Sequence, residues 1–425
     1  MILNFRNSAV TTWLIPLSYA VGALIVGFTV PRLADTILPG YVSTISVNAA
    51  IGIYSAVASG MIALTGIVFS LTFVMVQFSA TAYSPRLVLW IARDQAMSHS
   101  MGVFTATFLY ALAALAWVDR GGSGRVPLSG TAFVIALLIV SVIMFILLIH
   151  RVGMLQINRM LTFTADQGRK IIENLYPSLE TPPCQDSAQI AKLPSLQILL
   201  HHGQPRIIQE VDIPALVEVA RGNECVVELL AHVGDAALEA TPLVRVLGVG
   251  SPVPEDSLRG AIRLGAERTF TQDPKYSIRL LVDIAIKALS PAINDPTTAV
   301  QALDQIEDLL IRLGRRRLEI GSFYDSAGSL RLLINFPTWD DFLSLAFDEI
   351  RLYGATSIQV MRRMKALVNE LISLLPEERQ PALRGWQERL QLAVERSFPD
   401  HLDRLEASAE DRQGLGSTSR KLERS

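Results

Sequence analysis

A cluster of polar side chains lies where one helix-like stretch ends at Ser290-Pro291 and the next begins at Asn294-Asp295-Pro296. Its hydroxyls, amide and carboxylate belong to Ser290, Asn294, Asp295, Thr297 and Thr298. The first turn of a helix has free N–H groups and a positive potential, which together attract anions. These residues are therefore candidates for binding a small anionic ligand, with Arg268 and Gln272 as further donors if the fold brings them close. The alternative is purely structural: Asp295 caps the second helix and the threonines fix the corner.

A second set of polar and small residues follows one face of an uncharged stretch, residues 36–85. Its members are Gly52, Ser55, Ser59, Gly66, Ser70 and Gln77. Steps of three, four and seven residues place them on one stripe of a helix. Small residues and hydroxyls are typical of close helix–helix contacts in membranes. The other interpretation is a pore lining formed by Ser55, Ser59, Gly66, Ser70 and Gln77, with Gln77 at the cytoplasmic end and Arg86 near the mouth.

Other chemistry has little support in the sequence. There is no visible nucleophile–base pair, metal-ligand constellation or phosphate-binding glycine loop, so we predict neither an enzyme nor a metal site. Cys184 and Cys225 lack nearby metal-ligating partners and are expected to be free thiols. One segment, VELLAHVGDAALEATPLVRV, resembles the hairpin of small biotinyl- or lipoyl-type barrels. It contains no lysine, so covalent cofactor attachment is not supported and no cofactor is predicted.

The charge distribution divides the chain into a membrane part and a water-facing part. The first 150 residues hold six arginines and three aspartates, with no lysine or glutamate, whereas the other 275 residues hold 69 charged side chains. Four long apolar segments lie between those few charges, at about 13–30, 49–82, 101–118 and 131–149. About 20 apolar residues span the hydrocarbon core as a helix. We therefore predict a lipid-embedded bundle of four transmembrane helices.

Arginine positions predict the orientation of this bundle. With four spans, Arg6, Arg86, Arg93 and the basic residues after the last span share one side, and Arg32, Arg120 and Arg125 share the other. The positive-inside rule then places both termini in the cytoplasm. Whether residues 36–48 re-enter the membrane is left open by the sequence. The net charge of −2 gives no indication of nucleic-acid binding, which favours a basic excess.

The soluble part is predicted to be an α+β region. We expect a connecting helix and linker over 151–195, a small β-rich subdomain over 196–250, a mostly helical subdomain over 251–405 and a disordered tail over 406–425. Strands are expected at 198–201 and 206–211 around the His202–Pro205 turn, and at 225–233 and 243–247 through Gly234. Helices are expected from Asp273-Pro274, from Asp295 and after Thr338, together with two later ones.

Three segments of the chain are similar to a known family. ALSPAINDPTTAVQALD, RTFTQDP upstream and VFSLTFVMVQFSATAYSPR in the second apolar segment resemble the bacterial predicted membrane proteins of domain of unknown function 2254. The resemblance covers about residues 10–400. It implies a multi-span inner-membrane protein with a cytoplasmic C-terminal region. It does not imply any particular activity.

Two functions are consistent with the sequence and with this resemblance. The first is an oligomeric, channel-like or transport-like protein with a cytoplasmic regulatory region. The second is a membrane-tethered ligand sensor or scaffold that transports nothing. The lipid bilayer and further copies of the same chain are the expected partners in both.

Overall fold

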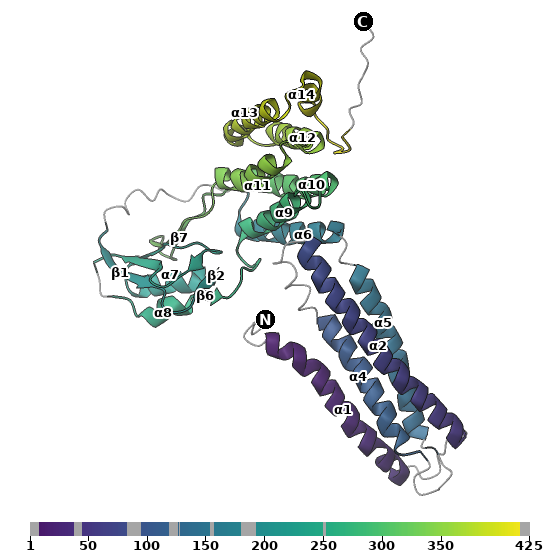
Figure 1. Ribbon diagram of the computed structural model, residues 1–425. Coiled ribbons are helices and arrows are strands. Elements are labelled where there is room, and N and C mark those ends of the chain that lie inside the picture. Colours follow the sequence, from purple (N-terminus) through teal and green to yellow (C-terminus); the bar gives the residue numbers. More distant parts are fainter. Residues whose placement is uncertain are drawn as a thin grey trace. The chain divides into compact units, whose positions relative to one another are not determined.

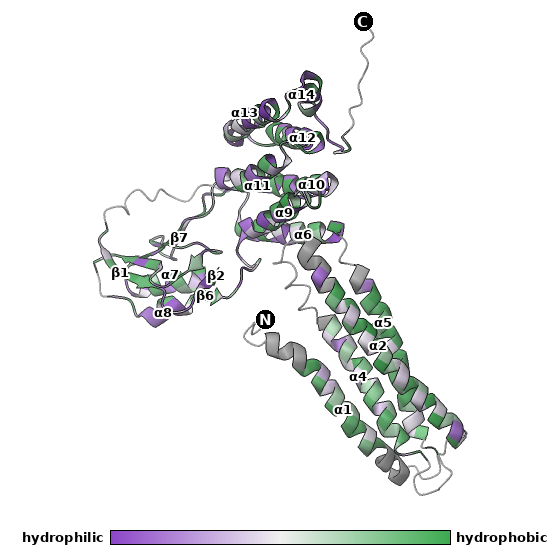
Figure 2. Cartoon of the chain, viewed as in Figure 1, coloured by the Kyte–Doolittle hydropathy of each residue, from purple (hydrophilic) through white to green (hydrophobic). Residues whose placement is uncertain are grey.

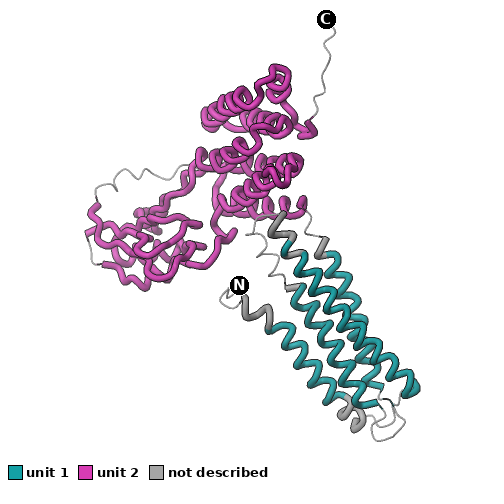
Figure 3. The backbone as a smooth tube through the Cα atoms, viewed as in Figure 1, with its two compact units in different colours: residues 1–156 teal, residues 157–425 magenta. Residues whose placement is uncertain are grey.

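The computed structural model describes residues 8–37, 45–82, 95–118, 126, 128–153, 157–179, 193–249 and 252–416. The chain divides into two compact units, residues 1–156 and 157–425 (Figure 3). The first unit, named the membrane unit, carries the apolar helices (Figure 2). The second, named the soluble unit, carries the strands and most of the charged side chains.

The membrane unit consists, in its described part, of the helices α1 (Ser8–Ile37), α2 (Val47–Ala82), α4 (Gln95–Leu115) and α5 (Leu128–Gly153) (Figure 1). Three of them contain stretches long and apolar enough to cross a membrane: Val47–Val74, Met97–Leu115 and Leu128–His150. The apolar part of α1, Leu14–Val30, is shorter. The structure thus supports three of the four expected spans and leaves α1 as a shorter apolar helix.

Hydroxyl pairs connect the helices inside this unit. The Tyr54 hydroxyl of α2 lies 2.6 Å from Thr131 Oγ1 of α5, and Thr107 Oγ1 of α4 lies 2.8 Å from Ser141 Oγ of α5. All four residues are buried. A polar group has no water to bond in the hydrocarbon region, so such pairs fix which faces of the helices meet.

The described residues of the soluble unit form two small sheets. The strands are β1 (Ser195–Leu200), β2 (Arg206–Val211), β3 (Val226–Leu229), β4 (Ala236–Ala237), β5 (Pro242–Leu247), β6 (Ile262–Gly265), β7 (Ser322–Tyr324) and β8 (Leu330–Ile334). The five-stranded sheet has the order β1-β5-β3-β8-β7, and the three-stranded sheet has the order β4-β2-β6. All pairs are antiparallel except β3 with β8. Apolar side chains from both sheets form one core.

This topology corrects two expectations. β1 and β2 do not form a hairpin around the His202–Pro205 turn, because β1 pairs with β5 and β2 pairs with β4 and β6 in the other sheet. The boundary expected at residue 250 does not enclose the strands, because β8 returns from residue 330 to pair with β3. Parallel pairing requires such a long crossover. The pattern of apolar and polar residues along a strand does not indicate which distant strand will be its partner.

The other described elements of the soluble unit are helices. They are α6 (Ile157–Leu175), α7 (Ile213–Gly222), α8 (Glu255–Gly260), α9 (Pro274–Ala288), α10 (Pro296–Gly314), α11 (Trp339–Gly354), α12 (Ile358–Leu374), the short 3-10 helix η3 (Glu377–Arg379), α13 (Gln380–Ser397) and α14 (His401–Ala407). Proline in the first turn and an aspartate cap begin α7, α9 and α10, as the sequence predicts. A reciprocal Thr338–Asp341 capping box begins α11.

The segment after α14 is packed, so the prediction of a disordered tail from residue 406 is wrong for residues 406–416. The buried Asp411 carboxylate accepts hydrogen bonds from the N–H groups of Gln413, Gly414 and Gly416. Polar and charged segments tend to be disordered because they bury too little apolar surface to offset the entropy of ordering. Here one aspartate satisfies three backbone donors, and Gly414 adopts the left-handed φ of 66° that the turn requires. Residues 417–425 lie outside the described residues.

Ion pairs join α6 to α10. Arg169 Nε of α6 donates to Asp308 Oδ2 at 2.6 Å, and Arg312 Nε donates to the same oxygen at 3.1 Å. Burial by itself would raise the pKa of the Asp308 carboxyl. The hydrogen bonds and charges of Arg169 and Arg312 outweigh burial and hold this pKa below its usual range.

Asp308→Asn is therefore expected to lower the free energy of unfolding by about 1 kcal/mol at pH 7, given that the carboxylate is partly exposed. A carboxyl group whose pKa is lowered on folding stabilises the fold at pH values above its unfolded pKa of 3.8. This stabilisation is lost as the pH falls through the pKa of the folded state. The difference between the two proteins should therefore shrink below pH 3.8. Denaturant unfolding of the full-length protein at pH 7 and pH 3 measures it. Asp166→Asn, which removes a more exposed partner of Arg169, should have the smaller effect; an equal effect would contradict the assignment.

Candidate functional site

The small and polar stripe of α2 lies on the outer surface of the membrane unit. Its members are all exposed in the single chain: Gly52, Ser55, Ser59, Gly66, Ser70 and Gln77. A Cβ built at Gly52 or Gly66 would have no atom within 4 Å. The opposite face carries the buried Tyr54, Val57 and Met61. The stripe is therefore one continuous helix face, and no other described helix of this chain covers it. Arg86 lies outside the described residues.

The corner between α9 and α10 is held by its own hydrogen bonds. Asp295 Oδ1 accepts from the Thr298 N–H at 3.1 Å, and Asp295 Oδ2 accepts from the Thr298 hydroxyl at 2.5 Å. Ser290 Oγ donates to the Lys287 carbonyl oxygen at 2.7 Å. Asn294 has a left-handed φ of 49°, and Thr297 is exposed. These contacts are those of a capped corner, which is the structural alternative given above.

The fold separates the other two expected ligands from this corner. Arg268 and Gln272 precede α9, whereas Ser290 and Asp295 follow it. The 15 residues of α9 put about 22 Å between its ends. The structure therefore divides the expected anion site into two groups that cannot contact one ligand, because a straight helix keeps them apart.

Asp295→Ala should lower the free energy of unfolding by about 1 kcal/mol, because it removes the N-cap of α10. Asp295→Asn should recover most of that loss, because the amide oxygen still accepts from the Thr298 N–H. Hydrogen–deuterium exchange of the first α10 amides measures both changes. Equal loss in the two variants would show that the charge of Asp295, and not its capping bond, is what matters.

Gln272 and Asp273 instead join the helices to the three-stranded sheet. Gln272 Oε1 accepts from the Val211 N–H at 2.9 Å, and Gln272 Nε2 donates to the Val211 carbonyl oxygen at 3.1 Å. The side chain thus pairs with β2 as a neighbouring strand would. Asp273 is 2% exposed and caps α9 through the Tyr276 N–H. Its Oδ2 lies 3.0 Å from Arg268 Nε.

A glycine makes room for this buried ion pair. Gly234 has a φ of 93°, and a Cβ built there would collide with both Arg268 and Asp273. The sequence pattern identifies Gly234 as a turn residue and Asp273 as a cap. It gives no signal that the two meet, since nearly forty residues separate them. Arg268 also lies over the Tyr276 ring, with Cζ 5.9 Å from the ring centroid.

The space beside this ion pair is too small for a substrate. The cavity next to Asp273 has a volume of about 30 Å³ and is lined by residues of α9, β2 and the segment after β8. A volume of this size holds one or two water molecules. No group of three or more His, Cys, Asp or Glu residues that could hold a metal ion occurs in the described part of the chain. The arrangement around Asp273 thus works as a joint between the sheets and the helices.

Comparison with known proteins agrees with a membrane assignment. Uncharacterized proteins of Mycobacterium bovis and Mycobacterium tuberculosis are 27% identical to this chain over 424 residues, covering 95% of it and 79% of each relative. No solved structure matches the chain. The family model described as predicted membrane protein (DUF2254) matches residues 10–370, which include the described helices of the membrane unit apart from the first two residues of α1, and most of the soluble unit. The chain therefore belongs to this family of predicted membrane proteins.

Proposed function

We propose that this protein is an oligomeric, channel-like transport protein of the bacterial inner membrane, in which α2 helices of neighbouring copies enclose the path. The exposed stripe of α2 carries this proposal. A lipid-facing surface favours large apolar side chains, and α2 has these on the flanks of the stripe, at Ile62, Ile67 and Phe69. Glycine and serine between those flanks are better explained by a second helix or by water.

The spacing of the stripe suits repeated contact with another helix. Small residues recur four apart, as Gly52 with Ala56, Ser59 with Ala63 and Gly66 with Ser70, and the three pairs are seven residues apart. A seven-residue repeat keeps one face toward a partner helix that crosses at about 20°. The small residues of the stripe run from Gly52 to Ser70, about 27 Å along the axis, which is close to the hydrocarbon thickness of about 30 Å. The next position of the repeat is the exposed Phe73, four residues before Gln77.

Within this proposal α1 is the fourth span. Tyr19 of α1 lies 3.2 Å from His99 of α4 through its hydroxyl. Gly27 of α1 and Gly102 of α4 each lie against the other helix so closely that a Cβ would collide. Such close approach is typical of paired membrane helices. Four spans with the arginine distribution described above place both termini in the cytoplasm.

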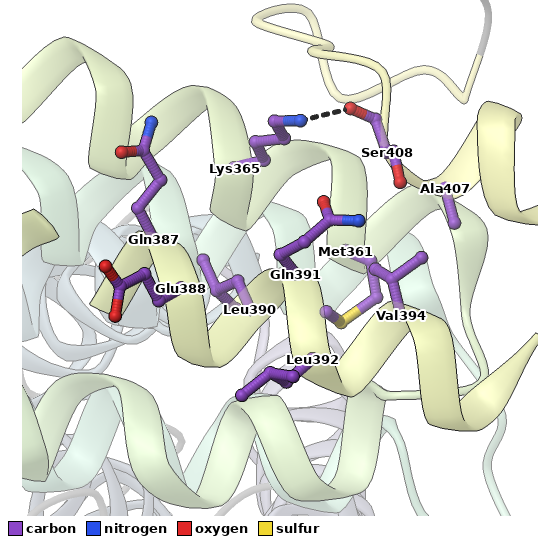
Figure 4. Close-up of a pocket in the computed structure, with 10 residues that line it drawn as sticks. All are labelled: Met361, Lys365, Gln387, Glu388, Leu390, Gln391, Leu392, Val394, Ala407 and Ser408. Carbon is purple, nitrogen blue, oxygen red and sulfur yellow. Dashed lines mark hydrogen bonds between the residues drawn. The ribbon is translucent and has the colours of Figure 1, made fainter. Parts of the chain in front are cut away.

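The second candidate function, a tethered sensor or scaffold, is favoured by a groove in the soluble unit. It lies between α12, α13 and the end of α14, with a volume of about 500 Å³ (Figure 4). Met361, Leu390 and Val394 supply apolar lining, and Lys365 donates to the Ser408 carbonyl oxygen at 2.6 Å. A groove of this size fits a small ligand or part of a partner protein.

Cysteine accessibility distinguishes these functions. Ser59→Cys is made in the full-length protein after Cys184 and Cys225 are replaced by serine, and Phe69→Cys serves as the matched lipid-facing control. Both positions are exposed in the single chain, and they lie about 80° apart around α2. A charged, membrane-impermeant thiol reagent is applied to proteoliposomes while ion efflux is followed. We expect the reagent to modify the Ser59→Cys variant and to reduce its ion efflux. The Phe69→Cys variant should remain unmodified, with unchanged ion efflux.

Two other outcomes would change the assignment. Disulfide cross-linking between copies at Ser59→Cys without reaction with the charged reagent would indicate a dry helix contact, and the sensor or scaffold function would replace the channel. Absence of both reaction and cross-linking would place the stripe against lipid and overturn the proposal.

A further inference from the structure

We propose that three arginines where α11 meets α13, Arg351, Arg389 and Arg396, form a binding site for a phosphate group. The site lies wholly within the soluble unit, and it does not depend on how α2 assembles.

Two of the guanidinium groups meet at one carboxylate oxygen. Arg389 Nη2 lies 2.8 Å from Asp348 Oδ1, and Arg351 Nη2 lies 3.9 Å from the same oxygen. Arg396 follows Arg389 by seven residues on α13, which places the two on the same side of that helix. Arg396 is exposed and forms no ion pair with any described residue.

The charges at this contact do not balance. Arg389 and Arg351 share the Asp348 carboxylate, and the charge of Arg396 also acts on Arg351, whereas the neighbouring Glu349 is paired with Arg279. The Arg351 side chain is 17% exposed, and its buried Nε has no hydrogen-bond partner. Burial lowers the pKa of Arg351, the charges of Arg389 and Arg396 lower it further, and only Asp348 opposes them. A bound anion would offset this repulsion.

The Arg389 guanidinium is held in place before any ligand arrives. Its Cζ lies 4.0 Å from the centroid of the Trp386 ring, a cation–π contact. The Trp386 ring in turn packs edge-on against Phe347, with the centroids 5.3 Å apart. The Arg389 side chain is still 47% exposed, so its donors remain open to solvent. Preorganisation of this kind reduces the entropic cost of binding.

Phosphate is the anion that fits this arrangement. Guanidinium forks bind phosphate oxygens in pairs, and a phosphate monoester carries a charge of about −1.5 to −2 near neutral pH. That charge matches three arginines and one aspartate. Leu392 lies between Arg389 and Arg396 on α13, and Leu352 follows Arg351; they are 48% and 62% exposed. The apolar rim suits a phosphate with a hydrocarbon body, and its source is a lipid headgroup or a soluble phosphate ester.

Calorimetric titration of the full-length protein in zwitterionic nanodiscs tests the site. The probes are inorganic phosphate and monomeric dihexanoyl phosphatidic acid, which share the phosphate and differ in the hydrocarbon. We expect Arg396→Gln to weaken binding of at least one probe tenfold or more. This variant is not expected to disturb folding, since Arg396 forms no ion pair. Arg384→Gln, an exposed position on the same helix, is the matched control and should change binding less than twofold.

Each outcome has a definite meaning. Binding of both probes would support the site and show that phosphate alone suffices, whereas binding of the lipid alone would support the site and assign a lipid source. Absence of binding by either probe, or equal weakening by Arg396→Gln and Arg384→Gln, would overturn the proposal. The double variant Arg389→Gln/Arg396→Gln should abolish binding, and retention of its α13 amide protection would show that the loss is not caused by unfolding.

Discussion

Replacing Asp273 by alanine is expected to lower the free energy of opening α9 by about 3 kcal/mol. The substitution removes the cap of the helix, which contributes about 1 kcal/mol. It also leaves Arg268 without its buried partner, and breaking a buried pair from one side costs several kcal/mol. The Arg268 side chain is 27% exposed, so water can solvate part of its charge, and we expect the broken ion pair to account for about 2 kcal/mol of the total.

Hydrogen–deuterium exchange of the α9 amides in the full-length protein measures this change locally. Asp273→Asn is the matched variant, because the amide oxygen keeps the bond to the Tyr276 N–H and loses only the charge. It should recover about 1 kcal/mol of the loss. A loss in Asp273→Ala that is no greater than that of a simple cap would show that the Arg268 ion pair contributes nothing.

A double variant isolates the ion pair from the cap. Asp273→Ala combined with Arg268→Met removes both charges, so no unpaired guanidinium remains at the joint. The combined loss should be smaller than the sum of the two single losses by 1 kcal/mol or more, as expected for residues in contact. Additive losses would mean that the two side chains stabilise α9 independently.

Local features of this fold could be read directly from the sequence. The helix starts at Asp273-Pro274 and Asp295-Pro296 are correct to the residue, because an aspartate cap before proline in the first turn is a local chemical pattern. The apolar helices of the membrane unit are equally local, since they depend on length and hydropathy alone. α1 is the exception because its apolar window, Leu14–Val30, is near the lower limit for a span.

Features that depend on distant residues could not be read in this way. The pairing of β3 with β8 joins segments about a hundred residues apart, and no periodicity specifies that partner. Two other features likewise depend on residues that are distant in the sequence. They are the contact of Gly234 with the Arg268–Asp273 ion pair and the cluster of arginines where α11 meets α13. Arg268 and Gln272 are not further donors at the expected anion site for the opposite reason: they are close in sequence to Ser290 and Asp295, but α9 holds the two groups at its opposite ends. Spacing predicts which residues share a helix face, and tertiary contacts decide what that face meets.

Replacing Gly66 by isoleucine is expected to weaken self-association of the protein at least tenfold, a change of about 1.4 kcal/mol. Gly66 lies at the centre of the α2 stripe with open space around it, where a partner helix can approach only if no side chain intervenes. Gly60→Ile is the matched control. Gly60 is equally open but lies about 120° around the helix from Gly66. Gly60→Ile therefore changes helix propensity and hydrophobicity in the same way as Gly66→Ile but leaves the stripe intact.

Energy transfer between labelled copies in liposomes, measured as the lipid-to-protein ratio is raised, gives the association free energy of each variant. Weaker association of Gly66→Ile with normal association of Gly60→Ile would support the stripe as the contact between copies. Equal association of both variants and the unmodified protein would place the contact elsewhere. Because the same stripe carries the proposed path, Gly66→Ile should also reduce ion efflux in proteoliposomes. Reduced efflux without loss of association would separate the two roles, since isoleucine can narrow a water-filled path without preventing the copies from meeting.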